Sequence, residues 1–392
     1  RNHLSAYLKH LILMVSAEAA SRGVTSITLK WSYPSAFSED MKSALENAFT
    51  NLQQWIMGIQ KAIKVTVAKQ GETESIAVCR YLSERDKSMG PKVIADIGGG
   101  TIDICVWDNG NIKTQTSVSL ASRIFIEYIG SQDGLRREIF LLLNKPHNGN
   151  SSCYFTVRPA HCFNNLIKEY HEALYPLFND KKRREAGWKE CRSIIFLIFS
   201  GIIYYIGMIL KSIDFHSSAI QFAGNGSKLI NLVDNNAISR LWGFLPDNIR
   251  DNIRIRPALA AHTKQEAARG LLSNTSFNTY VNPTIIIGED GYKFGGRDVG
   301  FGQEITTADL TEEIEPPDNY PRLMDFLGRY NRCAEKLELE SLEIPHDLNL
   351  QAEMKGKIGF LSYQQKDHPE QVEIQPFFIE ELKLLIKIFF FK

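Results

Sequence analysis

The residues with the clearest chemical potential form a short glycine-rich segment, residues 96–103, with the sequence DIGGGTID. Its three consecutive glycines, Gly98, Gly99 and Gly100, carry no Cβ atom, so the backbone there can adopt positive φ angles and approach a ligand closely. Successive N–H groups in such a turn point into one concavity, which suits phosphate oxygens. The hydroxyl of Thr101 adds a further donor. The segment therefore predicts a phosphate-binding loop.

Two acids, Asp96 and Asp103, bracket this loop. A carboxylate does not favour a bare phosphate, but it can hold Mg²⁺ directly or through water, and the metal can then bridge to the phosphate. A plain β-hairpin connection would account for the glycines but not for the acids or the threonine. The pattern therefore favours a magnesium–nucleotide complex over a free anion, with Asp96 and Asp103 as the metal-associated acids.

A second glycine-rich turn follows an apolar stretch at residues 219–223, which is expected to be a strand. A helix is expected after it, at residues 228–235. A turn between a strand and a helix presents free N–H groups and the positive end of the helix dipole to a ligand. The candidate ligand-binding residues of this turn are Gly224, Asn225, Gly226, Ser227 and Lys228.

The periodicity of apolar residues predicts the elements that would position both turns. The first loop is expected between strands at 92–96 and 102–107, and the signal DNGN at 108–111 predicts a hairpin turn with a return strand at 112–118. Other elements are expected as a helix at 4–22, a strand at 24–31, a helix at 38–59, a strand at 64–68, and helices at 72–82 and 263–272.

The composition limits the function classes. The 392 residues allow roughly two to three domains. Lysine and arginine number 45 against 45 aspartates and glutamates, so the net charge of +0 argues against a bulk nucleic-acid binder. Hydrophobic residues at 44% indicate a folded chain. The six scattered cysteines show no metal-binding spacing, which predicts free thiols in a reducing compartment and a cytoplasmic location.

One apolar run, from Ile194 to Leu210, contains no charged residue and is flanked by Arg192 and Lys211. A run of about 18 apolar residues can span a bilayer. This run is marginally short and leads directly into the strand and second glycine turn. It therefore predicts a helix buried inside a large domain and no membrane partner.

The segment DIGGGTID resembles the second phosphate loop of the superfamily that contains actin, the DnaK-type (Hsp70) chaperones and the sugar and acetate kinases. Other segments resemble superfamily motifs in the expected order, and the resemblance covers roughly residues 4–272. They are a strand-and-turn segment at 26–37 (SITLKWSYPSAF), a connecting helix at 71–82 (GETESIAVCRYL), an adenosine motif at 222–229 (FAGNGSKL) and a returning helix at 264–270 (KQEAARG). The connecting segment is more similar to the divergent DnaK-like branch than to actin.

The resemblance implies a two-lobed, actin-like (ribonuclease-H-like) α/β ATPase fold. The first phosphate loop of the superfamily (D-x-G-T/S) finds no match, so we expect an incomplete first lobe whose missing part precedes Arg1. The Gly-Gly pair that often follows the second hairpin is Ala121-Ser122 here. The implied units are the rest of the first lobe at 1–95, the second lobe at 96–262, the returning helix at 263–272 and a C-terminal extension of unknown role at 273–392.

The resemblance also implies roles for individual residues, with ATP and Mg²⁺ as cofactors. Residues 98–101 would hold the β- and γ-phosphates, Asp96 would organise Mg²⁺ and its waters, and Asp103 would join the water shell of the metal or phosphate. An acid of the connecting helix would orient or deprotonate the attacking water. For that acid Glu72 is the first choice and Glu74 the second. Besides the second glycine turn, Lys189 and Arg192 would contact ribose or adenine.

The function that follows is ATP binding and hydrolysis by a divergent DnaK/actin-like protein. Nucleotide state would be coupled to lobe closure and reported to a protein partner or an attached domain. Three alternatives remain open: an actin-like filament-forming ATPase, a small-molecule kinase of the same fold, and a nucleotide-binding scaffold without hydrolysis.

Overall fold

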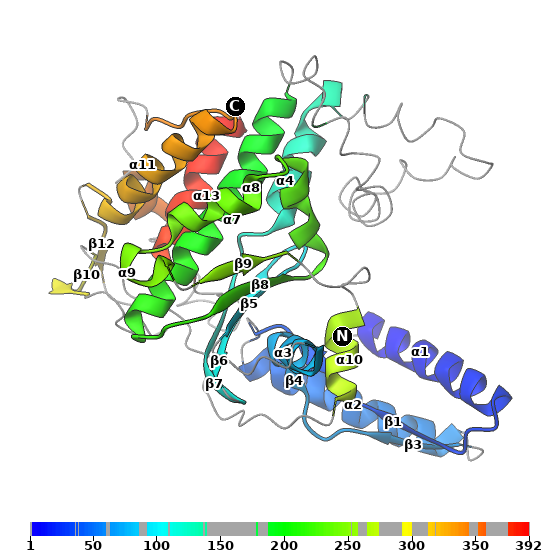
Figure 1. Cartoon of the computed structure of the whole chain (residues 1–392). Coiled ribbons are helices and arrows are strands. Elements are labelled where there is room, and N and C mark those ends of the chain that lie inside the picture. Colours follow the sequence, from blue (N-terminus) through cyan, green and yellow to red (C-terminus); the bar gives the residue numbers. More distant parts are fainter. Residues whose placement is uncertain are drawn as a thin grey trace.

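A computed structural model describes most of the chain (Figure 1). The residues that it describes are 2–35, 37, 39–59, 63–85, 92–108, 110–135, 138, 178, 187–251, 253–257, 265–273, 292–299, 313–317, 319–344, 352–357 and 375–391. The start of the returning helix expected at 263–272 lies outside them, as do Cys153 and Cys162. The four described cysteines that are free thiols are Cys79, Cys105, Cys191 and Cys333.

A five-stranded mixed sheet forms the centre, in the order β7-β6-β5-β8-β9. Strands β5, β6 and β7 form an antiparallel meander, whereas β8 and β9 run parallel to β5. The strands and the hairpin expected around the first glycine loop are therefore confirmed. Their bounds are Lys92–Ile97 (β5), Ile102–Asp108 (β6), Asn111–Val118 (β7), Ala219–Ala223 (β8) and Arg254–Arg256 (β9).

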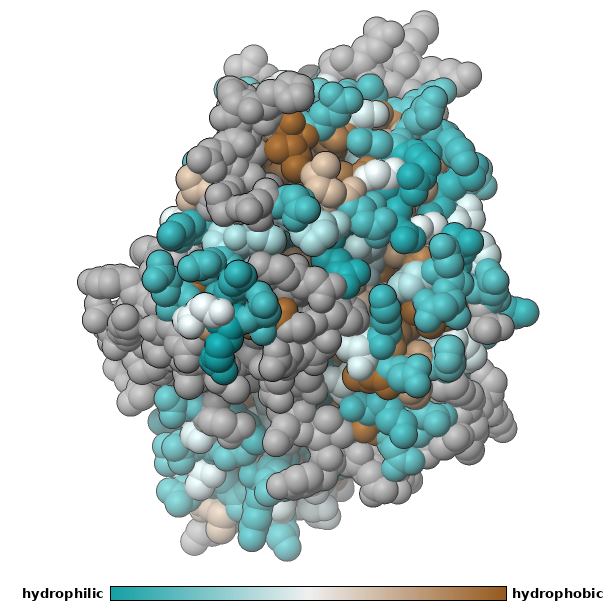
Figure 2. Space-filling view, turned by 90° about the vertical axis from the view of Figure 1, so that its left-hand side faces the viewer, coloured by the Kyte–Doolittle hydropathy of each residue, from teal (hydrophilic) through white to brown (hydrophobic). Residues whose placement is uncertain are grey.

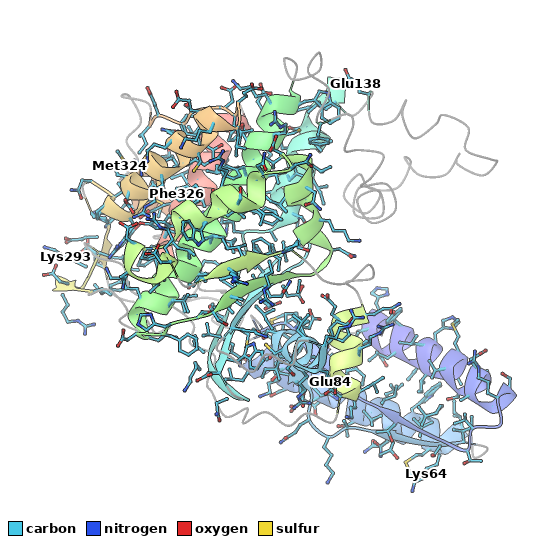
Figure 3. The ribbon with its side chains drawn as sticks, in the orientation of Figure 1. Lys64, Glu84, Glu138, Lys293, Met324 and Phe326 are labelled. Atoms are coloured by element: carbon cyan, nitrogen blue, oxygen red, sulfur yellow. The ribbon has the colours of Figure 1, made fainter. Side chains whose placement is uncertain are left out.

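One face of this sheet is covered by helices that form the upper part of Figure 1. Strand residues of alternating position, such as Val93, Ala95 and Phe222, point into this core. The helices that share it are α4 (Ser122–Ser131), α7 (Trp188–Ser212), α11 (Pro321–Lys336) and α13 (Phe377–Phe390). Aromatic contacts bind the layer together: the ring of Phe326 lies 5.6 Å from that of Tyr204, pointing from α11 towards α7 (Figure 3).

Helix α7 contains the uncharged apolar run of the sequence. By length and composition it is the one described helix that could cross a membrane, but its most apolar stretch is entirely buried inside the protein. A core helix of a globular protein passes the same test. The expectation of a buried helix at 194–210 therefore agrees with its packing, while the absence of a membrane partner stays a prediction.

The other face of the sheet is covered by two crossing helices, α3 (Glu74–Arg85) and α10 (Gln265–Leu272). Residues of α3 pack on Ile94, Cys105 and Trp107 of the sheet. The two helices touch backbone to backbone at Gly270, where a Cβ atom would lie 1.6 Å from the carbonyl oxygen of Ala77. Only glycine allows this approach.

The N-terminal part has its own small core between two helices and a parallel strand pair (lower right of Figure 1). Leu8 and Ile12 of one helix meet Leu52 and Ile56 of the other. Its elements are α1 (Asn2–Ser21), β1 (Ser26–Leu29), α2 (Glu39–Ile59) and β3 (Lys64–Val67), followed by the parallel pair β2 (Ser32–Tyr33) and β4 (Glu72–Thr73).

Two expectations about elements need correction. The helix expected at 228–235 is a 3₁₀ helix, η2, over Asn225–Leu232. The connecting helix begins at Glu74 rather than at 72, because residues 72–73 pair with β2 as strand β4. The division into units at 95/96 stays a prediction. The remaining short elements are α8 (Ala237–Leu241), η3 (Trp242–Phe244), α9 (Asp247–Arg250), β10 (Lys293–Phe294), β11 (Arg297–Asp298) and β12 (Ile314–Glu315).

The described parts of the C-terminal extension are built into the main core. Tyr292, Phe294, Tyr330 and Phe378 are all buried in the same cluster as the sheet. Seen from the left-hand side of Figure 1, the described surface is mostly hydrophilic, with apolar residues in small separate groups (Figure 2). The described residues from 292 onward therefore contribute to the core that supports the sheet.

Candidate functional site

The first glycine loop joins β5 to β6, and its two acids lie opposite one another. Asp96 pairs directly with Asp103 in the antiparallel ladder, so both side chains lie on the same face of the sheet. The turn is closed by the N–H of Gly98, which donates to the carbonyl oxygen of Thr101 at 3.0 Å. Residues 99 and 100 are exposed. The structure thus brings the loop and both acids together at one end of the sheet.

Helix α4 holds this loop from one side. The hydroxyl of Ser122 donates to the carbonyl oxygen of Gly98 at 2.8 Å, and the N–H of Arg123 donates to that of Gly99 at 2.7 Å. In a trans peptide the C=O and N–H groups point in opposite directions. The N–H groups of Gly99 and Gly100 therefore point away from α4, where they can donate to an anion.

The second glycine turn packs directly against the first. Because β8 runs parallel to β5, both strands end at the same edge, with Ala223 beside Asp96. Gly224 has a φ of 75°, and a Cβ atom there would lie 2.2 Å from Oδ1 of Asp96. A Cβ atom on Gly226 would lie 2.9 Å from the carbonyl oxygen of Gly98. The contact between the two turns requires glycine at both positions.

Asp103 is a buried acid at the junction with the N-terminal part, with 3% of its surface exposed. Burial and the nearby charge of Glu74 raise its pKa to about 6, although the nearby hydroxyl of Ser117 and the hydrogen bond from Ser35 act in the opposite direction. The backbone N–H of Ser35 donates to Oδ1 of Asp103 at 3.2 Å. This acid therefore links the sheet to the strand-and-turn segment at 26–37.

The two candidate acids of the connecting segment have different surroundings. Glu72 lies on β4 and forms an ion pair with Arg80 at 2.8 Å. Glu74 begins α3 and lies close enough to Asp103 to raise the pKa of that acid. Their roles in catalysis stay predictions, and of the two it is Glu74 that the fold places beside the glycine-loop acids.

A buried network of hydroxyl groups fixes the start of α3 on the sheet, and sequence reasoning missed it. The hydroxyl of Thr73 donates to Oε1 of Gln115 at 2.9 Å. The hydroxyl of Ser75 lies 3.1 Å from that of Ser35. No signal in the sequence joins these residues, because they come together only when β7 and the connecting segment meet.

Glu266 on α10 is a further residue that the sequence did not single out. Its side chain is buried, and Oε2 accepts a hydrogen bond from the N–H of Gly224 at 3.3 Å, while Oε1 has no hydrogen-bond partner among the described residues. Burial raises its pKa to about 7, against the effects of the Gly224 hydrogen bond, Arg85 and Lys228. In the sequence, the only sign of this residue is that Glu266 is the one acid of the segment KQEAARG.

Other predicted nucleoside contacts are placed differently. Lys189 forms an ion pair with Glu340 at 2.9 Å. Arg192 is 1% exposed, and its guanidinium donates to the carbonyl oxygens of Val233 at 2.7 Å and Leu337 at 3.1 Å. Both residues are engaged with the helical layer, and their contact with a nucleotide stays a prediction.

The predicted residues of the second turn lie together. The hydroxyl of Ser227 donates to the carbonyl oxygen of Gly224 at 2.6 Å, which closes the turn. Asn225 begins the 3₁₀ helix, and Lys228 lies within electrostatic reach of Glu266. The turn therefore packs its two glycines against the first loop, with Lys228 near Glu266.

Asp96 and Asp103 suit Mg²⁺ only if the phosphates of a bound nucleotide complete the coordination of the ion. Among the residues that the structure describes, no group of three His, Cys, Asp or Glu side chains could hold a metal ion. Mg²⁺ is usually bound through one or two carboxylates together with water and substrate phosphates. Asp96 and Asp103 beside the glycine loop would supply the two carboxylates of such a site.

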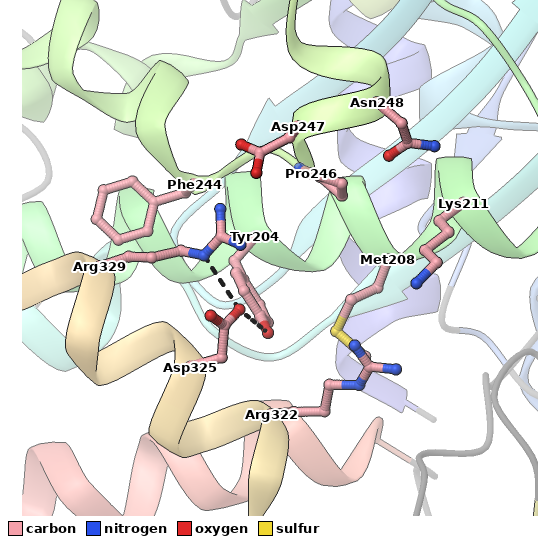
Figure 4. Close-up of a pocket in the computed structure, with 10 residues that line it drawn as sticks. All are labelled: Tyr204, Met208, Lys211, Phe244, Pro246, Asp247, Asn248, Arg322, Asp325 and Arg329. Atoms are coloured by element: carbon pink, nitrogen blue, oxygen red, sulfur yellow. Dashed lines mark hydrogen bonds and ion pairs between the residues drawn. The ribbon is translucent and has the colours of Figure 1, made fainter.

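A separate cavity of about 340 Å³ lies between α7, α9 and α11 (Figure 4). Tyr204 and Phe244 line it, and its acid Asp325 accepts hydrogen bonds from the hydroxyl of Tyr204 at 2.9 Å and from Arg329 at 3.0 Å. Arg329 also donates to two backbone carbonyl oxygens. These groups join α11 to α7 and to the segment at 243–245, and none of the predicted site residues lines the cavity.

The chain matches no protein-family model and no curated protein. Solved structures similar to it include the ethanolamine utilization protein EutJ from Carboxydothermus hydrogenoformans, with 12% identity over 68% of this chain and 73% of that chain and a TM-score of 0.37. A proposed sugar kinase from Cytophaga hutchinsonii shows 13% identity over 68% and 86%, with a TM-score of 0.35. MreB5 of Spiroplasma citri, bound to ADP, shows 15% identity over 68% and 73%, with a TM-score of 0.32.

These neighbours have actin-like ATPase folds. At such low identities and TM-scores, the similarity does not by itself establish that fold for this mixed α/β chain. The geometry of the two glycine turns carries the functional argument.

Proposed function

We propose that this protein binds ATP with Mg²⁺ at the two glycine turns and hydrolyses it, as a divergent DnaK/actin-like ATPase. The observation that carries the proposal is the contact between the turns, with Gly224 packed on Asp96. A phosphate-binding loop and a strand-ending turn that meet at one sheet edge suit the two ends of a nucleotide.

The first glycine loop and its two acids would bind the phosphates and the metal. The N–H groups of Gly99 and Gly100 and the hydroxyl of Thr101 would hold phosphate oxygens. Asp96 and Asp103 would bind Mg²⁺ through its waters, and the metal would neutralise charge on the phosphates. Phosphoryl transfer depends mainly on such positioning and charge stabilisation.

The nucleoside would lie along the second turn. Gly224, Gly226 and Ser227 would present their backbone to ribose and adenine, with Asn225 and Lys228 at the edge. Glu74, or Glu72 once released from Arg80, would orient the attacking water. Helices α3 and α10, which touch at Gly270, would transmit the state of the site to the N-terminal part. A protein partner or attached domain would read that state in the cytoplasm.

The test is single-turnover ATP hydrolysis by the purified chain, with Asp96→Ala as the variant. We expect the substitution to reduce turnover by about 10²-fold or more, as removal of one electrostatic stabiliser does. Lys387→Met, which removes an exposed charge on α13, is the control and should leave turnover unchanged. Equal rates for Asp96→Ala and the unmodified chain would refute the proposed role.

A nucleotide-binding scaffold without hydrolysis is the second candidate, and the ion pair between Glu72 and Arg80 favours it. It predicts saturable Mg–ATP binding, lost in Asp96→Ala, with no release of phosphate. ATP-dependent sedimentation would instead indicate the filament-forming alternative. ADP formation accelerated by a sugar or carboxylate acceptor would indicate the kinase alternative.

A further inference from the structure

Ser119, at the end of β7, is held by two side chains from the far C-terminal part of the chain. Its N–H donates to Oε1 of Gln375 at 2.7 Å. Its hydroxyl accepts a hydrogen bond from Nζ of Lys383 on α13 at 2.8 Å. Both bonds join residues more than 250 positions apart in the sequence, so they form only in the folded protein.

Ser119 begins the short segment that leads into α4, and the first turn of α4 holds the glycine loop. Three residues further on, the hydroxyl of Ser122 donates to the carbonyl oxygen of Gly98. The N–H of Arg123 donates to that of Gly99. Hydrogen bonds from the C-terminal part to Ser119, the backbone of residues 119–122 and hydrogen bonds from the start of α4 therefore connect α13 to the loop.

Helix α13 is itself firmly anchored, so it can act as a fixed support. Leu382 packs so closely on α7 that a Cβ atom at Gly201 would lie 2.2 Å from its Cδ2 atom. Glu380 is buried and forms ion pairs with Lys383 at 2.6 Å and with Lys357. The charge of Lys383 is therefore balanced while its ammonium group reaches Ser119.

We propose that α13 and Gln375, which lies two residues before it, form a positioning element of the nucleotide site. Gln375 and Lys383 fix Ser119, and through Ser119 they fix the carbonyl groups and hence the N–H directions of the glycine loop. The role in nucleotide binding rests on the proposed function. The coupling between α13 and the glycine loop is a property of the chain without ligand. It gives the extension at 273–392 a role in the site.

The coupling must act in both directions. If docked α13 favours the loop shape that binds nucleotide, bound nucleotide must favour docked α13 by the same free energy. A partner that displaced α13 would therefore weaken nucleotide binding without touching the site. This offers a way in which a partner could regulate it.

Hydrogen exchange of the unliganded protein tests the coupling directly. The reporters are the amides of Ser119, Gly98 and Arg123, each of which donates a hydrogen bond. The variants are Gln375→Leu and Lys383→Met, which each remove one contact to Ser119. Gln375→Glu keeps the acceptor and is the conservative variant, and Lys387→Met is the control on the same helix.

We expect exchange at Gly98 and Arg123 to accelerate about fivefold in Gln375→Leu and Lys383→Met, which corresponds to a loss of about 1 kcal/mol. Gln375→Glu and Lys387→Met should keep the original rates. Faster exchange at Ser119 with unchanged rates at Gly98 and Arg123 would overturn the proposal, because α13 would then support only the end of β7. General acceleration at every amide of the sheet would also overturn it, because it would show loss of the fold instead.

Nucleotide measurements separate this inference from the proposed function. If Mg–ATP binds, Lys383→Met should raise its KM or Kd severalfold with little change in kcat, and Mg–ATP should slow exchange in α13. Failure of the unmodified chain to bind Mg–ATP would refute the proposed function and leave the exchange result standing. Normal affinity in a variant with a loosened loop would refute the positioning role alone.

Discussion

Gly224 packs so closely against Asp96 that a Cβ atom would lie 2.2 Å from Oδ1 of the carboxylate. This contact joins two turns that are far apart in the sequence, one from each of two neighbouring parallel strands. The second turn therefore packs directly against one side of the first turn.

Gly224→Ala should destabilise the protein by about 1–3 kcal/mol, because the new Cβ atom meets Asp96 and the φ of 75° is unfavourable for alanine. Urea denaturation measures the change. Gly58→Ala is the matched control, since Gly58 lies in α2 and a Cβ atom there would meet no described atom within 4 Å. That substitution should stabilise by about 0.5–1 kcal/mol. Equal effects would contradict the tight contact.

Gly270→Ala should separate α10 from α3, because its Cβ atom would lie 1.6 Å from the carbonyl oxygen of Ala77. Backbone cannot yield as a flexible side chain can, so we expect a loss of about 2 kcal/mol or more. Gly201→Ala provides the comparison, since there the close atom is the end of Leu382. Thermal unfolding should show the larger loss for Gly270→Ala, and the reverse order would count against the helix crossing.

Two buried acids should give the protein a stability that falls with rising pH. Burial raises the pKa of Glu266 to about 7 and that of Glu381 to about 8, from the usual 4.5. Between the ordinary and the raised pKa the folded chain holds a proton that the unfolded chain has lost, so stability declines as pH rises. Glu381→Gln should reduce the fall in the free energy of unfolding between pH 7 and 8. Glu266→Gln should reduce that fall only below about pH 7.

Urea titrations between pH 5 and 9 measure these slopes, and Glu380→Gln is the contrast. Although burial raises the pKa of Glu380, Lys383 and Lys357 lower it overall, so its ionised form stabilises the fold. Its removal should cost stability at pH 7, and the cost should shrink as pH falls through the range in which Glu380 becomes protonated. A decline unchanged by Glu381→Gln would show that this acid does not carry it.

The pKa of Asp103 should respond to its neighbours in opposite directions. Glu74→Gln removes a negative charge and should lower the pKa of Asp103, whereas Ser117→Ala removes a nearby polar hydroxyl and should raise it from about 6. Carboxyl NMR titration of Asp103 measures both. Glu72→Gln is the control, since that side chain binds Arg80. An Asp103 titration insensitive to Glu74→Gln would place Glu74 away from the loop acids.

The hairpin and its glycine loop could be predicted because they depend on contiguous residues. Glycines between two runs of alternating apolar residues define the turn and its strands, and the binding of an anion there stays a prediction. The second turn was found in the same way. The resemblance implied nucleoside contacts for Lys189 and Arg192, but it did not indicate that the helical layer would engage both side chains.

The strands, the glycine turns and the buried helix α7 could be predicted from the residues alone, since each depends on short-range sterics and on the period of apolar residues. The contacts of Gly224 with Asp96, of Glu266 with the second turn and of Gln375 and Lys383 with Ser119 arise only in the folded protein. Those contacts join residues tens to hundreds of positions apart. Their formation depends on how the completed core places whole strands and helices, which no local pattern encodes.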